Sequence, residues 1–135
     1  MAEQVLPHVV TLSNALGLRV VLLRVSLPTE DIYHAMGFPV APYSDVSKEA
    51  DAQAQNYFDD FSEKLRNLGT AQVETEVLDG HPAEAILTFA EKTPDSLLAM
   101  TTHGRSGVSR LVMGSIADRV VRSIGGPLLL VRAAE

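Results

Sequence analysis

The 135-residue sequence contains no cysteine and no apolar run that approaches the roughly 18 residues of a membrane span. The absence of cysteine excludes disulfides and thiolate metal sites, and it fits a reducing compartment. No secretory leader precedes the first charged residue, Glu3. The four histidines, at positions 8, 34, 81 and 103, show no metal-ligand spacing, so we expect no structural metal. These absences predict a soluble, cytoplasmic protein that does not contact membranes.

Positive charge is scarce and unevenly placed. The net charge of −6 disfavours a general nucleic-acid-binding protein. Residues 101–135 nevertheless carry five arginines against two carboxylates, a net charge of +3, whereas residues 1–100 have a net charge of −9. This distribution suits a small anion better than a polyanion, and the alternative interpretation is a chance surface charge.

The length and the 46% content of hydrophobic residues predict a single domain over residues 1–135. Hydrophobic periodicity predicts helices over 2–16, 46–68, 82–92 and 115–124, and strands over 19–25, 72–78, 96–100 and 127–132. The near-continuous apolar run 19–25 is typical of a strand that is buried on both faces, and the alternating segment 72–78 is typical of a strand near a sheet edge. Strands that alternate with helices predict an α/β fold with a parallel sheet.

The segment THGRSGVSRLVMGS, residues 102–115, combines three glycines, two arginines and four hydroxyl side chains directly after the strand predicted at 96–100. Ligands of parallel sheets bind beyond the carboxyl ends of the strands. Clustered glycines can expose consecutive backbone N–H groups, and Gly114 and Ser115 stand where the next helix begins, a favourable place for an anion. We therefore expect this segment to bind a phosphate.

Common phosphate and nucleophile motifs do not explain this segment. The sequence has neither G-x-x-x-x-G-K-[ST] nor G-x-G-x-x-G, and residues 104–108 have valine where a nucleophile elbow requires its last glycine. The P-loop, dinucleotide-binding and α/β-hydrolase interpretations are therefore excluded.

The segment instead resembles a motif of the universal stress protein family, whose members carry G-x-x-G, nine residues, and then G-[ST] after the fourth strand. Here Thr101 to Gly104 are followed by nine residues and by Gly114 and Ser115, with threonine in place of the first glycine. The likeness extends to DGHPAEAI and GGPLLLV. It implies a three-layer, flavodoxin- or Rossmann-like fold with an open parallel sheet in the order 3-2-1-4-5.

The family's first strand, which ends in an aspartate, has no counterpart in this sequence, which starts inside the family's first helix. We expect the recorded start to lie downstream of the true one. The alternative is a strand from elsewhere, such as an exchanged segment of another subunit, that fills the central position.

In the nucleotide-binding branch of the family, this motif holds the ribose and triphosphate of ATP. The resemblance implies a role for matching positions only: phosphate contacts for Gly104, Arg105, Gly114, Ser115 and Ile116, ribose contacts for Met100 and Thr101, and an adenine contact for Val25. His103 either contacts phosphate or bonds to the backbone. ATP is expected with Mg²⁺ or Mn²⁺.

Catalytic groups are harder to find. Asp79 is either catalytic or, as we favour, a turn former, and Arg110 either binds phosphate or points into solvent. No general base is positioned by the pattern, so we assign no catalytic residue and expect at most a slow ATPase. The expected function is an ATP-binding stress-response module that works as a homodimer through residues 127–132 and acts on an unidentified protein partner. The alternatives are a slow ATPase and a nucleotide-free dimerisation module.

Overall fold

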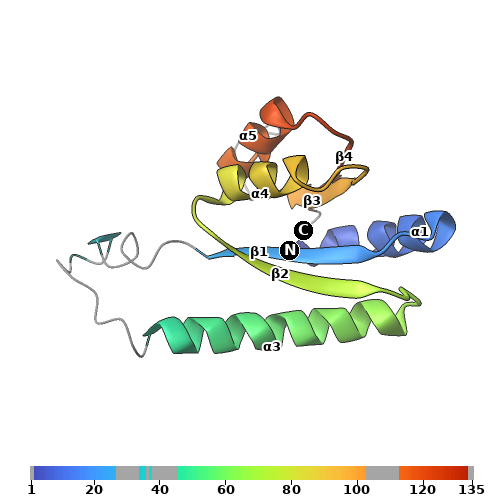
Figure 1. Cartoon of the computed structure of the whole chain (residues 1–135), viewed down its shortest axis with the longest axis horizontal. Coiled ribbons are helices and arrows are strands. Elements are labelled where there is room, and N and C mark those ends of the chain that lie inside the picture. Colours follow the sequence, from blue (N-terminus) through green and yellow to red (C-terminus); the bar gives the residue numbers. More distant parts are fainter. Residues whose placement is uncertain (1, 27–33, 36, 38–45, 103–112, 134–135) are drawn as a thin grey trace.

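The computed structural model describes residues 2–26, 34–35, 37, 46–102 and 113–133. Helices and strands alternate along the chain (Figure 1), which confirms the α/β class. Residues 26–44, for which the sequence predicts neither a helix nor a strand, lie largely outside the described residues. The elements are η1 (Ala2–Val5), α1 (Leu6–Leu16), β1 (Val20–Ser26), α3 (Val46–Asn67), β2 (Val73–Asp79), α4 (Pro82–Glu91), β3 (Leu98–Thr102), α5 (Ser115–Ser123) and β4 (Leu128–Arg132).

The ends of the helices follow local chemistry. Helix α1 ends at Gly17, whose φ of 65° is the left-handed conformation that glycine adopts without steric cost, and its N–H donates to the Ser13 carbonyl. Helix α4 has Pro82 in its first turn, where the missing N–H is not needed. In α5 the N-cap is Gly114, with no capping side chain. Ser115 and Asp118 have the spacing of a capping box, but Gly114 is the N-cap and the Asp118 carboxylate accepts a hydrogen bond from Arg122 instead.

The strands form two separate parallel pairs. Strands β1 and β2 pair from Val20 opposite Val73 to Ser26 opposite Asp79, and β3 pairs with β4 from Leu98 opposite Leu128 onward. Helix α4 follows β2, contacts β1 and leads into β3. Among the described strands no ladder joins the two pairs, so the parallel arrangement is confirmed within each pair, and the predicted order across the pairs stays a prediction.

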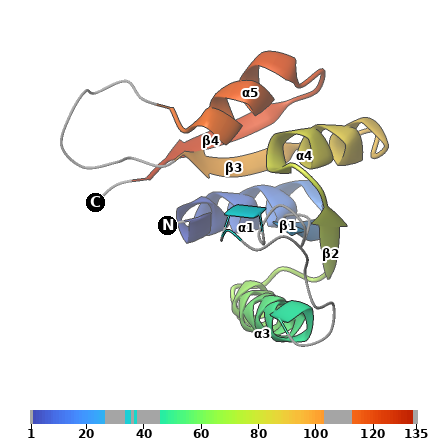
Figure 2. The ribbon, with the colours of Figure 1, turned by 90° about the vertical axis from the view of Figure 1, so that its left-hand side faces the viewer.

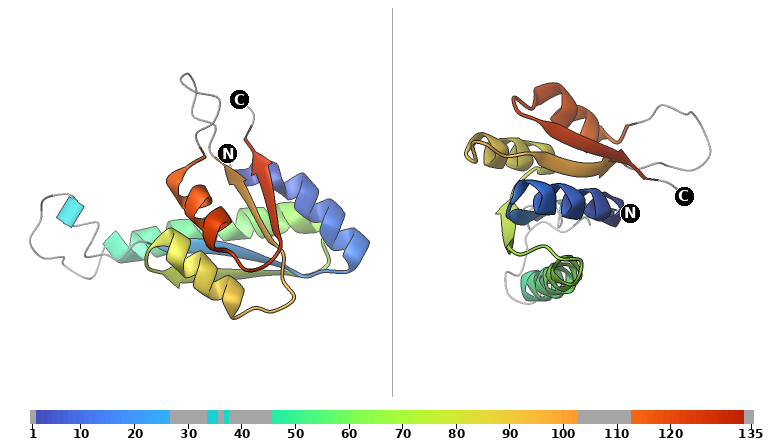
Figure 3. Two further views of the ribbon diagram at one scale, coloured as in Figure 1. Left: turned by 90° about the horizontal axis from the view of Figure 1, so that it is seen from above. Right: turned by 90° about the vertical axis from the view of Figure 1, so that its right-hand side faces the viewer.

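Helices cover the strand pairs from two sides. Helices α4 and α5 lie on one side of β3 and β4, with α1 on the other side, and α3 lies along β1 and β2 (Figures 1 and 2). Viewed from above, the two strand pairs run in clearly different directions (Figure 3). The layers of an α/β domain are therefore present, but the sheet between them is interrupted.

The most buried side chains come from the helices rather than from the strands. Thr102 is the one buried residue in the four strands, and every residue of β1 is half-buried. The expectation that residues 19–25 are buried on both faces is therefore wrong, and among the described strands β1 has a neighbour, β2, on one edge only. Strand β2 is largely exposed, as predicted for an edge. The buried apolar residues are Val5, Ala54, Phe58, Phe61, Leu65, Ala83, Ala117, Val120 and Ala133.

Candidate functional site

Three of the predicted site residues lie near the carboxyl ends of strands. Val25 is the next-to-last residue of β1, and Met100 and Thr101 lie in the second half of β3, opposite Leu130 and Val131 of β4. All three predicted site residues are half-buried. They stand where ligands of parallel sheets bind, at the ends to which the strands point.

The next three predicted site residues, Gly114, Ser115 and Ile116, lie at the amino end of α5. Gly114 has φ −56° and ψ 149°, which any residue can adopt, and an added Cβ would meet no described atom within 4 Å. Glycine is therefore not required here by the backbone conformation. Its missing side chain instead leaves the start of the helix open to close approach by another molecule.

Backbone N–H groups are available at this helix start. The first hydrogen bond within α5 runs from the Asp118 N–H to the Gly114 carbonyl, at 2.9 Å. The N–H groups of Ser115, Ile116 and Ala117 precede it, so the helix itself does not use them. Three such donors at the positive end of a helix dipole match the chemistry of a phosphate. Sequence analysis missed Ala117, although its place in the first turn was a sufficient signal.

The predicted site residues are divided among three elements. Helix α5, which begins at Ser115, contacts β3, the strand that carries Met100 and Thr101. Val25 belongs to the other strand pair and is not joined to β3 by a ladder. His103, Gly104, Arg105 and Arg110 lie outside the described residues.

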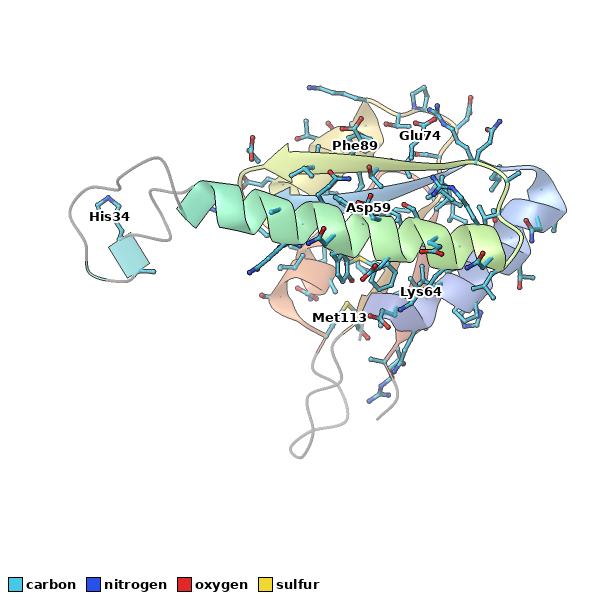
Figure 4. The ribbon with its side chains drawn as sticks, turned by 90° about the horizontal axis from the view of Figure 1, so that it is seen from below. His34, Asp59, Lys64, Glu74, Phe89 and Met113 are labelled. Carbon is cyan, nitrogen blue, oxygen red and sulfur yellow. The ribbon has the colours of Figure 1, made fainter. Side chains whose placement is uncertain are left out.

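Asp79, the remaining candidate from the sequence, lies within the described residues. Asp79 ends β2 and is exposed, and the next residue, Gly80, has φ 125° and donates its N–H to the Ser26 carbonyl at 3.0 Å. Asp79 therefore stands at a tight turn into α4, which favours the interpretation as a turn former. Met113 is half-buried directly before the Gly114 cap, where Figure 4 labels it.

The arginines of α5 are engaged with carboxylates. Arg119 Nη2 lies 2.7 Å from Glu84 Oε1 on α4, and Arg122 Nε lies 2.9 Å from Asp118 Oδ2. The hydrogen bond and charge of Asp118 raise the pKa of Arg122. These two cations are neutralised locally, so the expectation of a net positive tail overstates the attraction for an anion. The backbone donors of α5 are the better-placed source of that attraction.

The amino-acid sequence matches the sequence model of the Universal stress protein family over residues 1–132. The chain belongs to this family. Among the described residues, no helix is long and apolar enough to cross a membrane, and no group of three or more His, Asp or Glu residues is placed to hold a metal ion.

Curated relatives support the family assignment. The universal stress protein MJ0531 of Methanocaldococcus jannaschii is 41% identical over 69 residues, which are 51% of this chain and 41% of the relative. The universal stress protein Slr1230 of Synechocystis is 38% identical over 77 residues, which are 50% of this chain and 27% of the relative. Each match thus spans less than half of the relative's length.

Solved structures share the fold of this universal stress protein. Protein MJ0577 superposes with a TM-score of 0.77 at 22% identity, over 98% of this chain and 88% of the other. A universal stress protein in complex with cAMP gives a TM-score of 0.67 at 15% identity over the same shares. UspA from Lactobacillus plantarum gives 0.70 at 18% identity, over 96% and 88% of the two chains. Identities this low establish the fold alone.

Proposed function

We propose that this universal stress protein is a regulatory module that binds ATP where β3 ends and α5 begins. The observation that carries the proposal is the open amino end of α5, where three backbone N–H groups follow a glycine cap beside β3. Phosphates would accept from these N–H groups, and Met100 and Thr101 would lie on the ribose side. Val25 would contact the adenine from the other strand pair.

Two further facts favour a nucleotide as the ligand. A protein of the same fold has been solved in complex with cAMP, which is an adenine nucleotide. The donors of α5 are chemically matched to phosphate and are not already used by a capping side chain. Mg²⁺ or Mn²⁺ would be held through the ATP phosphates, since the described residues offer no cluster of their own for a metal ion.

The proposal includes a cytoplasmic homodimer formed through residues 127–132. Within the described part of the chain, β4 pairs with β3 and with no second strand. Its sequence, LLLVR, is apolar and contains no proline, so the edge can pair with the same strand of a second copy about a two-fold axis. Light scattering at tens of micromolar tests this part, and a monomeric mass would contradict it.

One observation favours a second candidate function, a dimer that acts without nucleotide. Val25 and Met100 belong to strand pairs that no ladder joins, so the adenine and ribose contacts are not held in one rigid sheet. Calorimetric titration with ATP separates the two candidates, because only the nucleotide-binding module would release or absorb heat in a saturable manner. Phosphate release over hours would then show whether bound ATP is hydrolysed.

The sharpest test of the site is the pair of substitutions Gly114→Val and Gly125→Val. Neither glycine has a positive φ, and an added Cβ at either position meets no described atom within 4 Å. Neither a positive φ nor a Cβ contact with described atoms therefore opposes the substitution at either position, and the two positions flank opposite ends of α5. We expect Gly114→Val to weaken ATP binding by about ten-fold or more, because the side chain blocks approach to the backbone donors.

The control, Gly125→Val, should bind ATP like the unmodified chain. Circular dichroism of both variants establishes that the fold is intact. Equal affinity in both variants and in the unmodified chain would refute the assignment of the phosphate site to α5.

A further inference from the structure

Strand β2 is the acidic strand among the four that the structure describes. Its seven residues, VETEVLD, include three carboxylates and no cation. Residues 74–77 are exposed, and Val77 keeps 44% of its surface exposed although it lies within the strand. Within the described part of the chain, the ladder partner of β2 is β1 alone. The outer edge of β2 is therefore an exposed, negatively charged strand edge.

The hydrogen bonds to β1 show which backbone groups of β2 point outward. The Val20 N–H donates to the Gln72 carbonyl, and the register continues without a break to the end of both strands. The even-numbered residues of β2 therefore bond to β1. Alternation along a parallel ladder turns the N–H and carbonyl groups of Thr75 and Val77 to the outer edge. Such a row of groups is a template on which an extended chain can form a further ladder.

The two faces of this edge differ chemically. Arg24 of β1 lies over the Tyr57 ring of α3, with 6.0 Å between its Cζ and the ring centroid, so side chains at this register position face α3. Val77 stands opposite Arg24 and lies on the same face. Glu74 and Glu76, at the alternate positions, lie on the other face. A strand added beside β2 would thus meet an apolar side chain on one face and carboxylates on the other.

The carboxylates of this edge are only partly neutralised. Glu74 Oε1 lies 3.2 Å from Arg19 Nη1, and more than half of each side chain is exposed, so water and salt screen this pair. Glu76 has no ion-pair partner among the described residues. Negative charge therefore remains available to a partner of opposite sign.

A second copy of the chain does not suit this edge. Self-pairing of β2 would bring the three carboxylates of each copy to one interface, and pairing about Thr75 would place Glu74 directly opposite Glu76 of the partner subunit. Like charges at opposed positions of a ladder are destabilising. Strand β4, by contrast, is LLLVR and has no carboxylate. The charge of β2 thus selects a basic strand rather than a second β2.

We propose that the outer edge of β2 docks an extended, basic segment of another protein as an added strand. The segment alternates basic and β-branched residues, with the basic side chains beside Glu74 and Glu76 and the β-branched ones beside Val77 on the α3 face. Seven residues match the length of β2. Figure 4 shows β2 along α3, with Glu74 labelled on the strand. The edge shares no residue with the proposed ATP site, so docking requires no nucleotide.

The first test measures the binding of a fluorescent peptide, KVKVKVK, by anisotropy in the absence of nucleotide. Two control peptides separate charge from pattern. The peptide EVEVEVE keeps the alternation and reverses the charge, and KKKKVVV keeps the composition and loses the alternation. We expect saturable binding of KVKVKVK that weakens at high salt, with both control peptides at least about ten-fold weaker.

Matched substitutions locate the binding surface. Glu76→Lys should weaken binding of KVKVKVK by about ten-fold or more. Glu63→Lys makes the same change of net charge at an exposed position of α3 and should alter binding by less than about two-fold. Thr75→Pro should also weaken binding by about ten-fold or more, because it removes an outward N–H and leaves the ladder to β1 intact. Its control, Thr75→Val, keeps that N–H and should bind the peptide normally. Circular dichroism of the four variants checks the fold.

Hydrogen exchange of the unmodified chain identifies the docked edge directly. Binding of KVKVKVK should slow exchange of the Thr75 and Val77 amides at least about ten-fold. The Glu76 amide already bonds to β1, so its exchange should change less.

Each contrary result refutes a different part of the proposal. Equal binding of KVKVKVK and KKKKVVV would show attraction of charge without strand addition, and equal binding of EVEVEVE would show that the carboxylates do not select the partner. Equal affinity of the Glu76→Lys and Glu63→Lys variants would place the peptide elsewhere. Absence of saturable binding would show that the carboxylates only protect the edge from pairing. Because nucleotide is absent and its proposed site is unaltered, these outcomes are independent of ATP binding.

Discussion

The substitution Leu65→Ala tests whether α3 supplies the main core of this protein. Leu65 has 0% of its surface exposed, and it belongs to the buried face of α3 with Phe58 and Phe61. Leu68, one residue beyond the end of the helix, is 55% exposed and provides the matched control, Leu68→Ala. The same atoms are removed at both positions, so the difference reports burial.

The expected magnitude follows from this difference. Truncation of a buried leucine loses roughly 0.8 kcal/mol for each methylene-sized group, and the cavity adds to that loss. We expect Leu65→Ala to lower the free energy of unfolding by about 3 kcal/mol. Leu68→Ala leaves no closed cavity and loses less than half of a full burial, so about 1 kcal/mol or less is expected.

Urea unfolding followed by far-ultraviolet circular dichroism measures both values, with the slope of the transition compared between variants. If the slope of the free energy of unfolding against urea concentration is the same in both variants, the substitution has changed stability rather than the compactness of the unfolded chain. If Leu68→Ala destabilised the protein as much as Leu65→Ala, the buried face assigned to α3 would be wrong.

Three further predictions concern polar groups. The Thr70 hydroxyl is buried and has no hydrogen-bond partner among the described residues, so Thr70→Val should raise the free energy of unfolding in urea by up to about 1 kcal/mol. The control Thr93→Val loses a 2.8 Å hydrogen bond to the Phe89 carbonyl on α4 and should lower that free energy by about 1 kcal/mol. Arg119→Ala should cost less than about 1 kcal/mol at low salt and nothing measurable at high salt, since its ion pair is exposed. Burial, with the charge of Glu3, raises the pKa of Tyr57 above 10.0 despite nearby Arg24. Because the folded state favours the neutral phenol, the contribution of Tyr57 to stability is complete below pH 10 and is lost as the pH rises through its folded-state pKa. An ultraviolet titration should therefore show one late-ionising tyrosine, and Tyr57→Phe should remove it.

The sequence predicted the helices well because their signals are local. The period of 3.6 residues, Gly17 after α1 and Pro82 at the start of α4 act within a few residues of the chain. The strand predicted over 96–100 is instead found at Leu98–Thr102. Its start is displaced because Asp95 adopts φ 57° and the Ser96 hydroxyl donates to the Thr93 carbonyl at 2.6 Å, so the turn after α4 extends further than the apolar pattern indicates.

Burial and long-range pairing were less predictable. An apolar run such as residues 20–26 shows what a strand is able to bury, whereas actual burial depends on neighbours that lie far away in the sequence. The ion pair of Arg119 with Glu84 joins residues 35 positions apart and has no sequence signal, whereas Arg122 and Asp118 are four apart on one helix and were recognisable by spacing.

Surface charge on α3 shows that a predictable local interaction need not indicate a function. Asp59 accepts a hydrogen bond from Gln55 at 3.0 Å, and Lys64 lies 4.9 Å from the Phe61 ring centroid (Figure 4). Both interactions follow from spacing on a helix, and neither bears on the candidate site. A charged residue in a helical pattern therefore indicates a solvated face before it indicates a function.

The interrupted sheet divides the proposed ATP site into two parts. The phosphate-binding part, formed by β3 and α5, depends on contacts that are already present, because β3 is paired with β4 and α5 packs on α4. The adenine contact at Val25 belongs to β1, whose position relative to β3 is not set by any ladder. Phosphate recognition therefore rests on contacts within one strand pair and its helices, whereas recognition of the base depends on how the two strand pairs are held relative to each other.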